Sequence, residues 1–226
     1  HAYEYIATDA IARFKRLDGF DVRFLTGTDE HGLKMAQAAE AEGVPTGQFA
    51  RRNSNVFQAL QEKLNISFDR FIRTTDPEHA RVVQGVLQRL WDKGEIDFRE
   101  YEGLYCVGCE AFKTEAELVD GKCPDHGPVP EWLEEKNWFF RLSAYQDRLL
   151  EHYAANPSAI EPDVRRNEVV SLIQGGLQDF SISRTTFDWG VPIPWDPEHV
   201  TYVWFDALTN YITAAGYASD PERFAR

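Results

Sequence analysis

Hydrophobic residues in the first part of the chain alternate between the spacing of helices and that of strands. Apolar residues recur every three or four positions over residues 3–17, which predicts an amphipathic helix. Residues 22–25, of which Val22, Phe24 and Leu25 are apolar, predict a buried strand, and a second helix is expected to begin near Thr46. The expected apolar faces are Tyr3, Ile6, Ala7, Ala10 and Phe14 in the first helix, and Phe49, Val56, Phe57, Leu60 and Leu64 in the second.

A strand and a third helix follow in the same order. Residues 68–72 indicate a strand, after which Asp76 is suited to cap a helix and Pro77 to occupy its first position. This helix is expected to end at Gly94. Its predicted buried residues are Val82, Val83, Val86, Leu87, Leu90 and Trp91. Helices and strands alternating in this way are typical of one half of a doubly wound parallel α/β sheet.

The pattern changes after Gly94. Residues 101–130 show little periodicity, contain many glycines and prolines and hold all three cysteines, which is typical of a small inserted module. Helices are predicted again at about residues 143–155 and 162–174, followed by a half-exposed strand around Phe180 and Ile182. Residues 202–205 predict a buried strand that leads into a helix at Asp206, as a second strand-and-helix unit of the parallel sheet.

Two short pairs of metal-ligating residues occur in the irregular segment. Two residues separate Cys106 from Cys109 and Cys123 from His126, and thirteen residues lie between the pairs. This spacing lets both members of a pair reach one ion, and four such ligands favour tetrahedral Zn²⁺. Because four protein ligands close the coordination sphere, we expect one structural zinc ion. Free buried thiols, or one disulfide with a spare cysteine, are the alternatives.

Composition limits the class of protein and its partners. Hydrophobic residues make up 43% and charged residues 27% of the 226 positions, the balance of a folded globular protein. A formal net charge of −13 disfavours binding of nucleic acid over the whole surface, so any contact with RNA needs a local basic stripe or further residues. No apolar run approaches the roughly 20 residues of a membrane span. The odd number of 3 cysteines favours a reducing compartment, the cytoplasm.

Polar residues directly follow the first predicted strand, in the sequence Gly-Thr-Asp-Glu-His-Gly at 27–32. Ligands of open α/β sheets bind beyond the carboxyl ends of the strands, so Asp29 is a candidate acceptor for a cationic group. That Asp29 merely caps the following helix is an equally supported alternative. A hydrolytic metal site formed by Asp29, Glu30 and His31 is disfavoured, because adjacent side chains project in different directions.

Three later or terminal features are further candidates. Aromatic residues at 202–205, followed by Ala207 and Tyr211, would line an apolar pocket with a polar rim, or would simply form core. Arg184 ends the strand of Ile182 and by itself indicates a surface charge. His1 stands at a helix N-terminus, where backbone N–H groups and the helix dipole favour an anionic phosphate.

Several segments, taken together, resemble the methionyl-tRNA synthetases, in the bacterial form with one zinc knuckle. The resemblance covers essentially the whole chain, and the order of the segments matches that of the family. The segments are HAYE at residues 1–4, GTDEHG at 27–32, the Cys/His pairs, SISRT at 181–185, WGVPIP at 189–194 and YVWFDAL at 202–208.

The resemblance implies a class I synthetase fold, an α/β fold whose Rossmann-like parallel sheet is split by an inserted zinc-knuckle connective domain. Residues 1–95 would form the first half of the catalytic domain, without its N-terminal strand, and residues 96–142 the inserted domain. Residues 143–200 would return the chain from the insertion through helices and a strand. Residues 201–226 would begin the second half of the catalytic domain.

The implied activity is that of a methionine–tRNA ligase. Such an enzyme activates L-methionine with ATP and Mg²⁺ to give methionyl-adenylate and transfers the methionyl group to the 3′ end of tRNA(Met). Asp29 would bind the α-amino group of methionine, and Arg184, expected to be catalytic, would pair with Asp29 nearby. His1 would act on the α-phosphate of ATP, and Glu4 would belong to the same ATP site. The residues expected to enclose the methionine side chain are Trp204, Ala207, Leu208 and Tyr211.

Other segments of the family do not occur among these residues. They are the first histidine of the nucleotide signature, the second nucleotide signature and the anticodon-binding domain, so residues 1–226 alone are expected to be inactive. Two rival interpretations remain. Another class I synthetase would require a larger editing insertion or an open zinc site. A zinc-knuckle RNA-binding module would require basic residues around the metal, whereas residues 95–135 are rich in Asp and Glu.

Overall fold

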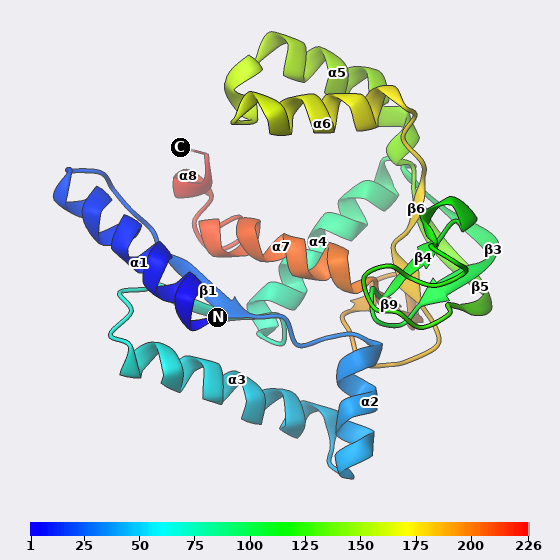
Figure 1. The fold of residues 1–226 in the computed structure, drawn as a ribbon, viewed down its shortest axis with the longest axis horizontal. Helices are drawn as coiled ribbons and strands as arrows, with labels where there is room; N and C mark the ends of the chain where they lie inside the picture. The colour runs from blue at the N-terminus through cyan, green and yellow to red at the C-terminus, as the bar shows by residue number, and fades with distance from the viewer. Residues whose placement is uncertain (226) are drawn as a thin grey trace.

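The computed structural model describes residues 1–225 and combines a short parallel sheet with two antiparallel sheets (Figure 1). The helices are α1 (Ala2–Leu17), α2 (Leu33–Glu42), α3 (Thr46–Lys63), α4 (Pro77–Asp92), α5 (Gln146–Ala155), α6 (Asp163–Gln174), α7 (Val203–Ala215) and α8 (Pro221–Phe224). The strands are β1 (Leu25–Thr28), β2 (Arg70–Arg73), β3 (Ile96–Cys106), β4 (Ala111–Lys113), β5 (Glu131–Phe140), β6 (Phe180–Ser181), β7 (Ser183–Arg184), β8 (Pro192–Ile193) and β9 (Asp196–Thr201).

The parallel sheet consists of β1 and β2, with α2 and α3 between them in sequence. Leu25 pairs with Arg70 and Thr28 with Arg73, so both strands end at the same edge. A parallel pair needs a crossover connection of a dozen or more residues, which α2 and α3 supply. The predicted parallel pair is confirmed, although β1 begins at Leu25, where the predicted strand was expected to end.

A long antiparallel hairpin carries the cysteine-rich segment. Strand β3 pairs with β5 from Ile96, opposite Phe140, to Tyr105, opposite Glu131. Strand β4 lies on the other side of β3, and β6 lies beside β5. The hydrophobic pattern did not predict β3 and β5. They bring Cys106 to the end of β3, and the second pair of metal-ligating residues lies in the loop between β4 and β5.

The larger core cluster lies between α4 and the antiparallel strands. Val83, Leu87 and Ile182 are completely buried there. The indole of Trp91 stacks on that of Trp195, with ring centroids 4.7 Å apart. The predicted helix at α4 is therefore confirmed with its buried face, whereas the expectation of a half-exposed strand at Ile182 is wrong. Ile182 is buried because it lies between β6 and β7 and contributes to this core.

The strand predicted at residues 202–205 is also wrong. Tyr202 stands at the N-cap of α7, and Val203–Ala215 is helical; the strand before it, β9, pairs antiparallel with β7 and β8. A short apolar run does not by itself distinguish a buried strand from the start of a helix. The residues buried after it, Asp206, Thr209 and Thr213, recur at helical spacing, and they are polar.

The helix predicted at residues 3–17 forms, but its expected apolar face does not contact the core among the described residues. Tyr3, Ile6 and Phe14 are exposed, and the buried side of α1 is formed by Asp9 and Ala12. On that side Asp9 accepts a hydrogen bond from the backbone N–H of Ser67 at 2.7 Å, and Ala12 packs in the smaller core cluster. These contacts hold this face of α1 against the loop before β2.

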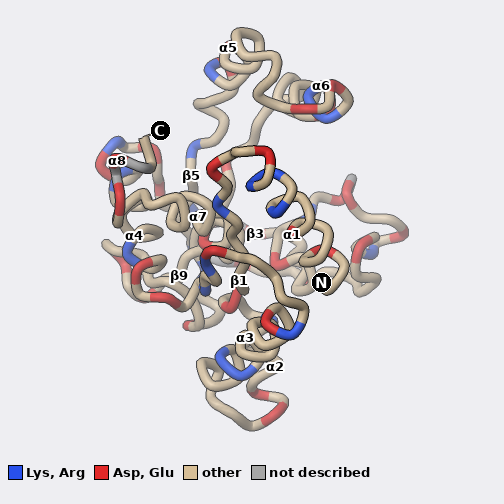
Figure 2. The backbone as a smooth tube through the Cα atoms, turned by 90° about the vertical axis from the view of Figure 1, so that its left-hand side faces the viewer, with Lys and Arg blue, Asp and Glu red and all other residues tan. Residues whose placement is uncertain are grey.

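Three further features concern the helices and the distribution of charge. None of the helices within residues 1–225 is long and apolar enough to cross a membrane. In the view of Figure 2, acidic and basic residues are interspersed along α1, α3 and α4. The helices α5 and α6 pack against each other and stand apart from α1 and α3 in Figure 1.

Replacing Leu87 by alanine is expected to lower the free energy of unfolding by about 2–5 kcal/mol, because it leaves a cavity in the larger core. The matched control is Leu172→Ala on α6, where the side chain is 70% exposed and the expected loss is below about 0.5 kcal/mol. Urea denaturation followed by circular dichroism compares the two variants. Equal losses would show that α4 does not anchor this core.

Candidate functional site

Glu30 fixes the loop that follows β1. Its carboxylate accepts hydrogen bonds from Arg73 Nε at 2.6 Å and Arg73 Nη2 at 2.7 Å, and from the hydroxyls of Thr28 and Thr75, each at 2.7 Å. Burial opposes ionisation of Glu30, but these hydrogen bonds and the charge of Arg73 outweigh it and hold the pKa below its ordinary value. The ends of the two parallel strands are thereby joined through one carboxylate.

The neighbours of Glu30 both contact α7: Asp29 through Asn210 and His31 through Asp206. Asp29 accepts a hydrogen bond from Asn210 Nδ2 of α7 at 3.0 Å. The N-cap of α2 is Gly32, with φ at +103°, and no side chain caps this helix. The interpretation of Asp29 as a helix cap is therefore wrong. Partial burial, followed by the negative charge of Asp206, raises the pKa of Asp29.

One cavity contains all five residues that the sequence predicted for methionine. It has a volume of about 280 Å³, and we call it the α7 cavity. The predicted residues lining it are Asp29, Trp204, Ala207, Leu208 and Tyr211, and the others are Leu25, Thr26, Gly27, Ile72 and Asn210. Its walls thus come from β1, the end of β2 and one face of α7, and Asp29 stands beside Asn210 at the polar side.

The helix α7 has the reverse of the usual amphipathic arrangement. Trp204, Leu208 and Tyr211 are exposed at helical spacing, whereas Asp206 and Thr213 are buried. Large exposed apolar side chains and buried polar ones are the informative exceptions in a folded protein. The exposed apolar stripe is one wall of the α7 cavity, and the opposite side of the helix carries a buried polar network.

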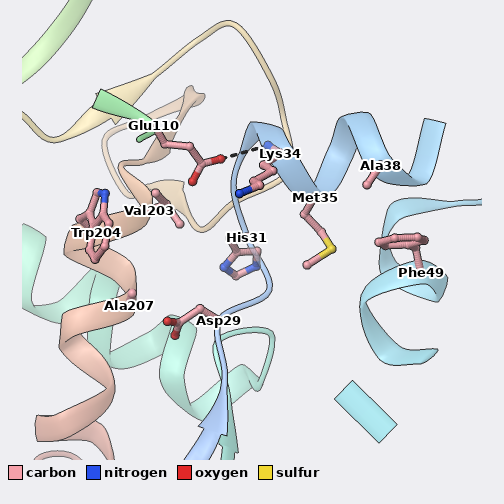
Figure 3. A pocket seen from close by; sticks show the side chains of 10 residues that line it. All are labelled: Asp29, His31, Lys34, Met35, Ala38, Phe49, Glu110, Val203, Trp204 and Ala207. Carbon is pink, nitrogen blue, oxygen red and sulfur yellow. Dashed lines mark hydrogen bonds between the residues drawn. The ribbon is translucent and has the colours of Figure 1, made fainter. Parts of the chain in front are cut away.

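A second cavity of about 360 Å³ adjoins the first, and we call it the α2 cavity (Figure 3). It shares Asp29, Trp204 and Ala207 with the α7 cavity. In Figure 3, Asp29 and His31 lie on the loop after β1 and face the side of α7 that carries Ala207. The remaining lining residues are Lys34, Met35, Ala38, Phe49, Glu110 and Val203.

The cysteine-rich loop reaches directly into the α2 cavity. Glu110 follows Cys109 and accepts a hydrogen bond from the backbone N–H of Lys34 at 3.0 Å, at the first turn of α2. Burial raises the pKa of Glu110, although Lys34 acts in the opposite direction. Trp204 Nε1 donates to the backbone carbonyl of Cys109 at 3.2 Å. The loop therefore helps to position both α2 and a wall of the cavities.

The four predicted metal ligands converge. The sulfurs of Cys106, Cys109 and Cys123 and a ring nitrogen of His126 all lie within 4.8 Å of one another. Cys109 Sγ is 3.5 Å from Cys123 Sγ and 3.2 Å from His126 Nδ1. These separations exclude a disulfide, and the cysteines are free thiols. They suit one tetrahedral ion, since bonds of about 2.3 Å place two sulfurs roughly 3.8 Å apart.

Two further observations support a cation at this cluster. A Cβ atom at Gly108 would come within 2.5 Å of the His126 ring, so only glycine allows the two ligand pairs to approach this closely. Burial and the neighbouring sulfurs raise the pKa of Cys109 to about 12, while the hydrogen bond with His126 lowers the pKa of Cys123 to about 6. Adjacent thiolates repel one another, so the three sulfurs cannot all ionise without a cation. A divalent ion bound between them stabilises the ionised form.

Arg184 lies in a different place from the one expected. It is only 2% exposed, so the interpretation as a surface charge is wrong. Its Nη1 donates to Ser181 Oγ at 2.8 Å, and its guanidinium carbon lies 4.4 Å from the ring centroid of Tyr202. It lines a third cavity with Asp179 and Tyr202, rather than either cavity that Asp29 lines. Its predicted catalytic role stays a prediction.

The two residues predicted for ATP stand together at the start of α1. His1 is the N-cap of the helix, and its Nδ1 lies 3.4 Å from Glu4 Oε2. Its ring meets that of Phe57 edge-on at 5.0 Å. Both residues are exposed, and neither lines the α7 or the α2 cavity. Their role at ATP stays a prediction.

The sequence interpretation missed several residues of this site. Asn210 binds Asp29, Glu110 and Met35 line the α2 cavity, and His79 binds Asp206. Asn210 could have been found, because it follows Ala207 by one helical turn. His79 could not have been found in this way, since it comes from another helix, and only the fold brings it to α7.

Comparisons with known proteins identify the family to which the chain is similar. A family model described as tRNA synthetases class I (M) matches residues 1–128 and 126–226. A methionine–tRNA ligase of Mycobacterium bovis is 61% identical over the whole chain, which covers 44% of that protein. A crystal structure of Mycobacterium tuberculosis methionyl-tRNA synthetase bound by methionyl-adenylate is 61% identical, with a TM-score of 0.93 over the whole chain and 46% of that chain.

The fold and the site therefore define a class I aminoacyl-tRNA synthetase. Within that class, the chain belongs to the family of methionyl-tRNA synthetases. It spans less than half the length of these relatives, 44% in the Mycobacterium bovis protein. The apo form of the Mycobacterium tuberculosis enzyme gives a lower TM-score of 0.81, at 56% identity over the whole chain and 44% of that chain. The arrangement of the elements thus resembles the methionyl-adenylate-bound form more closely.

Replacing Glu30 by glutamine is expected to lower the free energy of unfolding at pH 7 by about 3 kcal/mol, because Arg73 loses its charged partner. Since the pKa of folded Glu30 is lowered, its stabilisation is present above the ordinary carboxyl pKa of about 4.3 and is lost as the pH falls through the lower folded value. Urea denaturation between pH 7 and pH 3 measures the difference from wild type, which should shrink on acidification. The exposed Glu198→Gln is the control, and a pH-independent difference would contradict the assignment.

Removing one ligand of the Cys/His cluster is expected to abolish tight metal binding. Cys109→Ser and His126→Gln should retain well below one ion per chain after dialysis, as measured by plasma mass spectrometry. Because Trp204 donates to the Cys109 carbonyl, the tryptophan emission should also change when a chelator strips the wild type. His152→Gln, at an exposed histidine of α5, serves as the control and should keep its metal. Full occupancy in His126→Gln would show that the ion is held elsewhere.

Proposed function

We propose that the full-length protein containing these residues is a methionine–tRNA ligase. It activates L-methionine with ATP to methionyl-adenylate and transfers the methionyl group to the 3′ end of tRNA(Met). The observation that carries the proposal is the α7 cavity, which five predicted residues from two distant segments line together. The relative whose structure is bound by methionyl-adenylate supports it, at 61% identity and a TM-score of 0.93.

The polar side of the α7 cavity suits an ammonium group. Asp29 offers a carboxylate to the α-amino group of methionine, and the amide of Asn210 orients this carboxylate through a bond of 3.0 Å. Asp29 is thus the acceptor that this side of the cavity presents to a cation.

The apolar side of the same cavity suits a thioether. Trp204, Leu208 and Tyr211 line it from α7, and Ala207 leaves space between them. A volume of about 280 Å³ is at the small end of the cavities that bind ligands. A polarisable sulfur gains about 0.3–1.5 kcal/mol from contact with an aromatic ring. The lining therefore favours methionine over an amino acid with a charged side chain.

We infer the nucleotide and the metal ions from the family. ATP would be bound with Mg²⁺, and His1 and Glu4 are the residues of this chain that we expect at it, with His1 beside the α-phosphate. Arg184 would act from the neighbouring cavity that it lines with Tyr202. The ion of the Cys₃His cluster is taken to be zinc, because three thiolates and one imidazole are the ligands that structural zinc sites use. The thiols and the family agree with a cytoplasmic location.

Amino-acid-dependent exchange between pyrophosphate and ATP tests the reaction in the full-length protein. Methionine alone among the twenty amino acids should support exchange. Asp29→Asn should reduce kcat/KM for methionine about ten- to hundredfold, since a hydrogen bond to a charged group is worth about 1.5–3 kcal/mol and the amide adds a donor that faces the ammonium.

Asp147→Asn provides the matched control, because this exposed aspartate lies on α5, away from both cavities. Its exchange rate should equal that of the wild type. Exchange supported by another amino acid would retain a class I activation reaction and overturn the specificity. Absence of exchange with every amino acid would overturn the proposed function.

A further inference from the structure

Asp206 is a buried carboxylate that the recognition of methionine described above does not use. It is 1% exposed and accepts two hydrogen bonds, from His31 Nδ1 at 2.7 Å and from His79 Nε2 at 2.8 Å. His79 is completely buried, and its Nδ1 lies 3.1 Å from Thr213 Oγ1. Burial opposes the charge of Asp206, but the bonds from the two histidines outweigh it and hold the pKa below its ordinary value.

The network joins three elements that are distant in sequence. His31 lies two residues after Asp29 on the loop that follows β1, His79 lies in the first turns of α4, and Asp206 lies on α7. The opposite face of α7 carries the apolar wall of the α7 cavity, and His31 itself lines the α2 cavity. One carboxylate therefore fixes the separation between the Asp29 loop and the apolar wall.

A structural role alone does not explain the composition of the network. Replacement of a buried ionic cluster by apolar residues of similar volume is often neutral or stabilising, so stability does not require it. It lies beside the one carboxylate expected to bind the substrate cation, and its own carboxylate contributes to the raised pKa of Asp29. The two histidines act in the opposite direction on Asp29. The network is thus coupled to Asp29 both by geometry and by charge.

We propose that Asp206 is a positioning residue for methionine, which acts through His31 and His79 to hold the Asp29 loop and the apolar face of α7 at the separation that bound methionine requires. The inference deepens the proposed function and rests on it. Asp206 does not touch the substrate. It sets where the two groups that recognise the ammonium and the thioether stand relative to each other.

The test uses Asp206→Asn and His79→Gln in the full-length protein, with methionine as the probe. Equilibrium binding is measured by tryptophan fluorescence and by calorimetry between pH 5 and pH 8. Both variants should weaken methionine binding at pH 7 about tenfold, in the range of coupling energies of contacting groups. The KM for methionine should rise by a similar factor, while the KM for ATP changes less than about twofold.

The pH dependence separates positioning from general loosening. Loss of the Asp206 charge lowers the pKa of Asp29, whereas loss of His79 raises it. The acid limb of methionine binding should therefore move to lower pH in Asp206→Asn and to higher pH in His79→Gln. A general loosening of the fold would shift the acid limbs of the two variants in the same direction, or would leave both unchanged. The titratable groups that face Asp29 or line its cavities are His31, Lys34, His79, Glu110, Asp206 and Tyr211.

The matched control is His199→Gln. His199 is similarly buried and paired with a carboxylate, with Nδ1 2.8 Å from Asp196 Oδ2, but it contacts neither cavity. This variant should bind methionine as the wild type does. Equal weakening of methionine binding in all three variants would show that these buried groups act only through the stability of the fold. That result would overturn the inference.

A measurement on the wild type covers the case in which a variant does not fold. With ¹³C-labelled histidine, the ring signals of His31 and His79 should move when methionine is added, and that of His199 should not. Unmoved signals at saturation, or wild-type affinity in both folded variants, would overturn the role of Asp206. Absence of methionine binding by the wild type would instead overturn the proposed function, so the two failures are distinguishable.

Discussion

The carboxylate of Glu30 is the contact on which the site depends. It joins the carboxyl ends of two parallel strands by accepting two hydrogen bonds from Arg73 and one from each of two threonine hydroxyls. Its backbone takes part as well, because its carbonyl accepts from Trp189 Nε1 at 2.6 Å. With Glu30 held at the strand ends, Asp29 and His31 on either side of it contact Asn210 and Asp206 of α7. One buried ion pair thus anchors the loop that carries two candidate site residues.

The helix α7 turns that placement into a cavity. Its apolar stripe, with Trp204 and Tyr211, is exposed, and its polar stripe, with Asp206 and Thr213, is buried. An isolated soluble helix would be expected to have the reverse arrangement, so the hydrophobic effect alone does not orient α7. The hydrogen bonds of Asp206 orient it instead, and they leave an apolar surface free to contact a ligand. The free-energy cost of exposing that apolar surface to water is offset by the hydrogen bonds that both oxygens of the buried carboxylate accept.

The Cys/His cluster is not remote from this cavity. The carbonyl of Cys109 accepts from the indole of Trp204, and Glu110 binds the first turn of α2. A metal site that closes its coordination sphere with four protein ligands supplies rigidity rather than chemistry. A metal ion held by this cluster would rigidify the cavity walls through Cys109 and Glu110. The cysteine-rich segment therefore contributes to the shape of a cavity whose other walls come from β1, β2 and α7.

The sequence by itself determined the features that are encoded locally. Ligand spacing indicated the Cys₃His cluster, a proline and an aspartate marked the start of α4, and short motifs indicated Asp29 and the α7 residues. Only the tertiary structure decided that residues 203–205 begin a helix, that Arg184 is buried against Tyr202, and that His79 reaches Asp206. The physical reason is that an apolar run fits a strand or a helix equally well, and a buried charge is tolerated only where distant residues supply its partners.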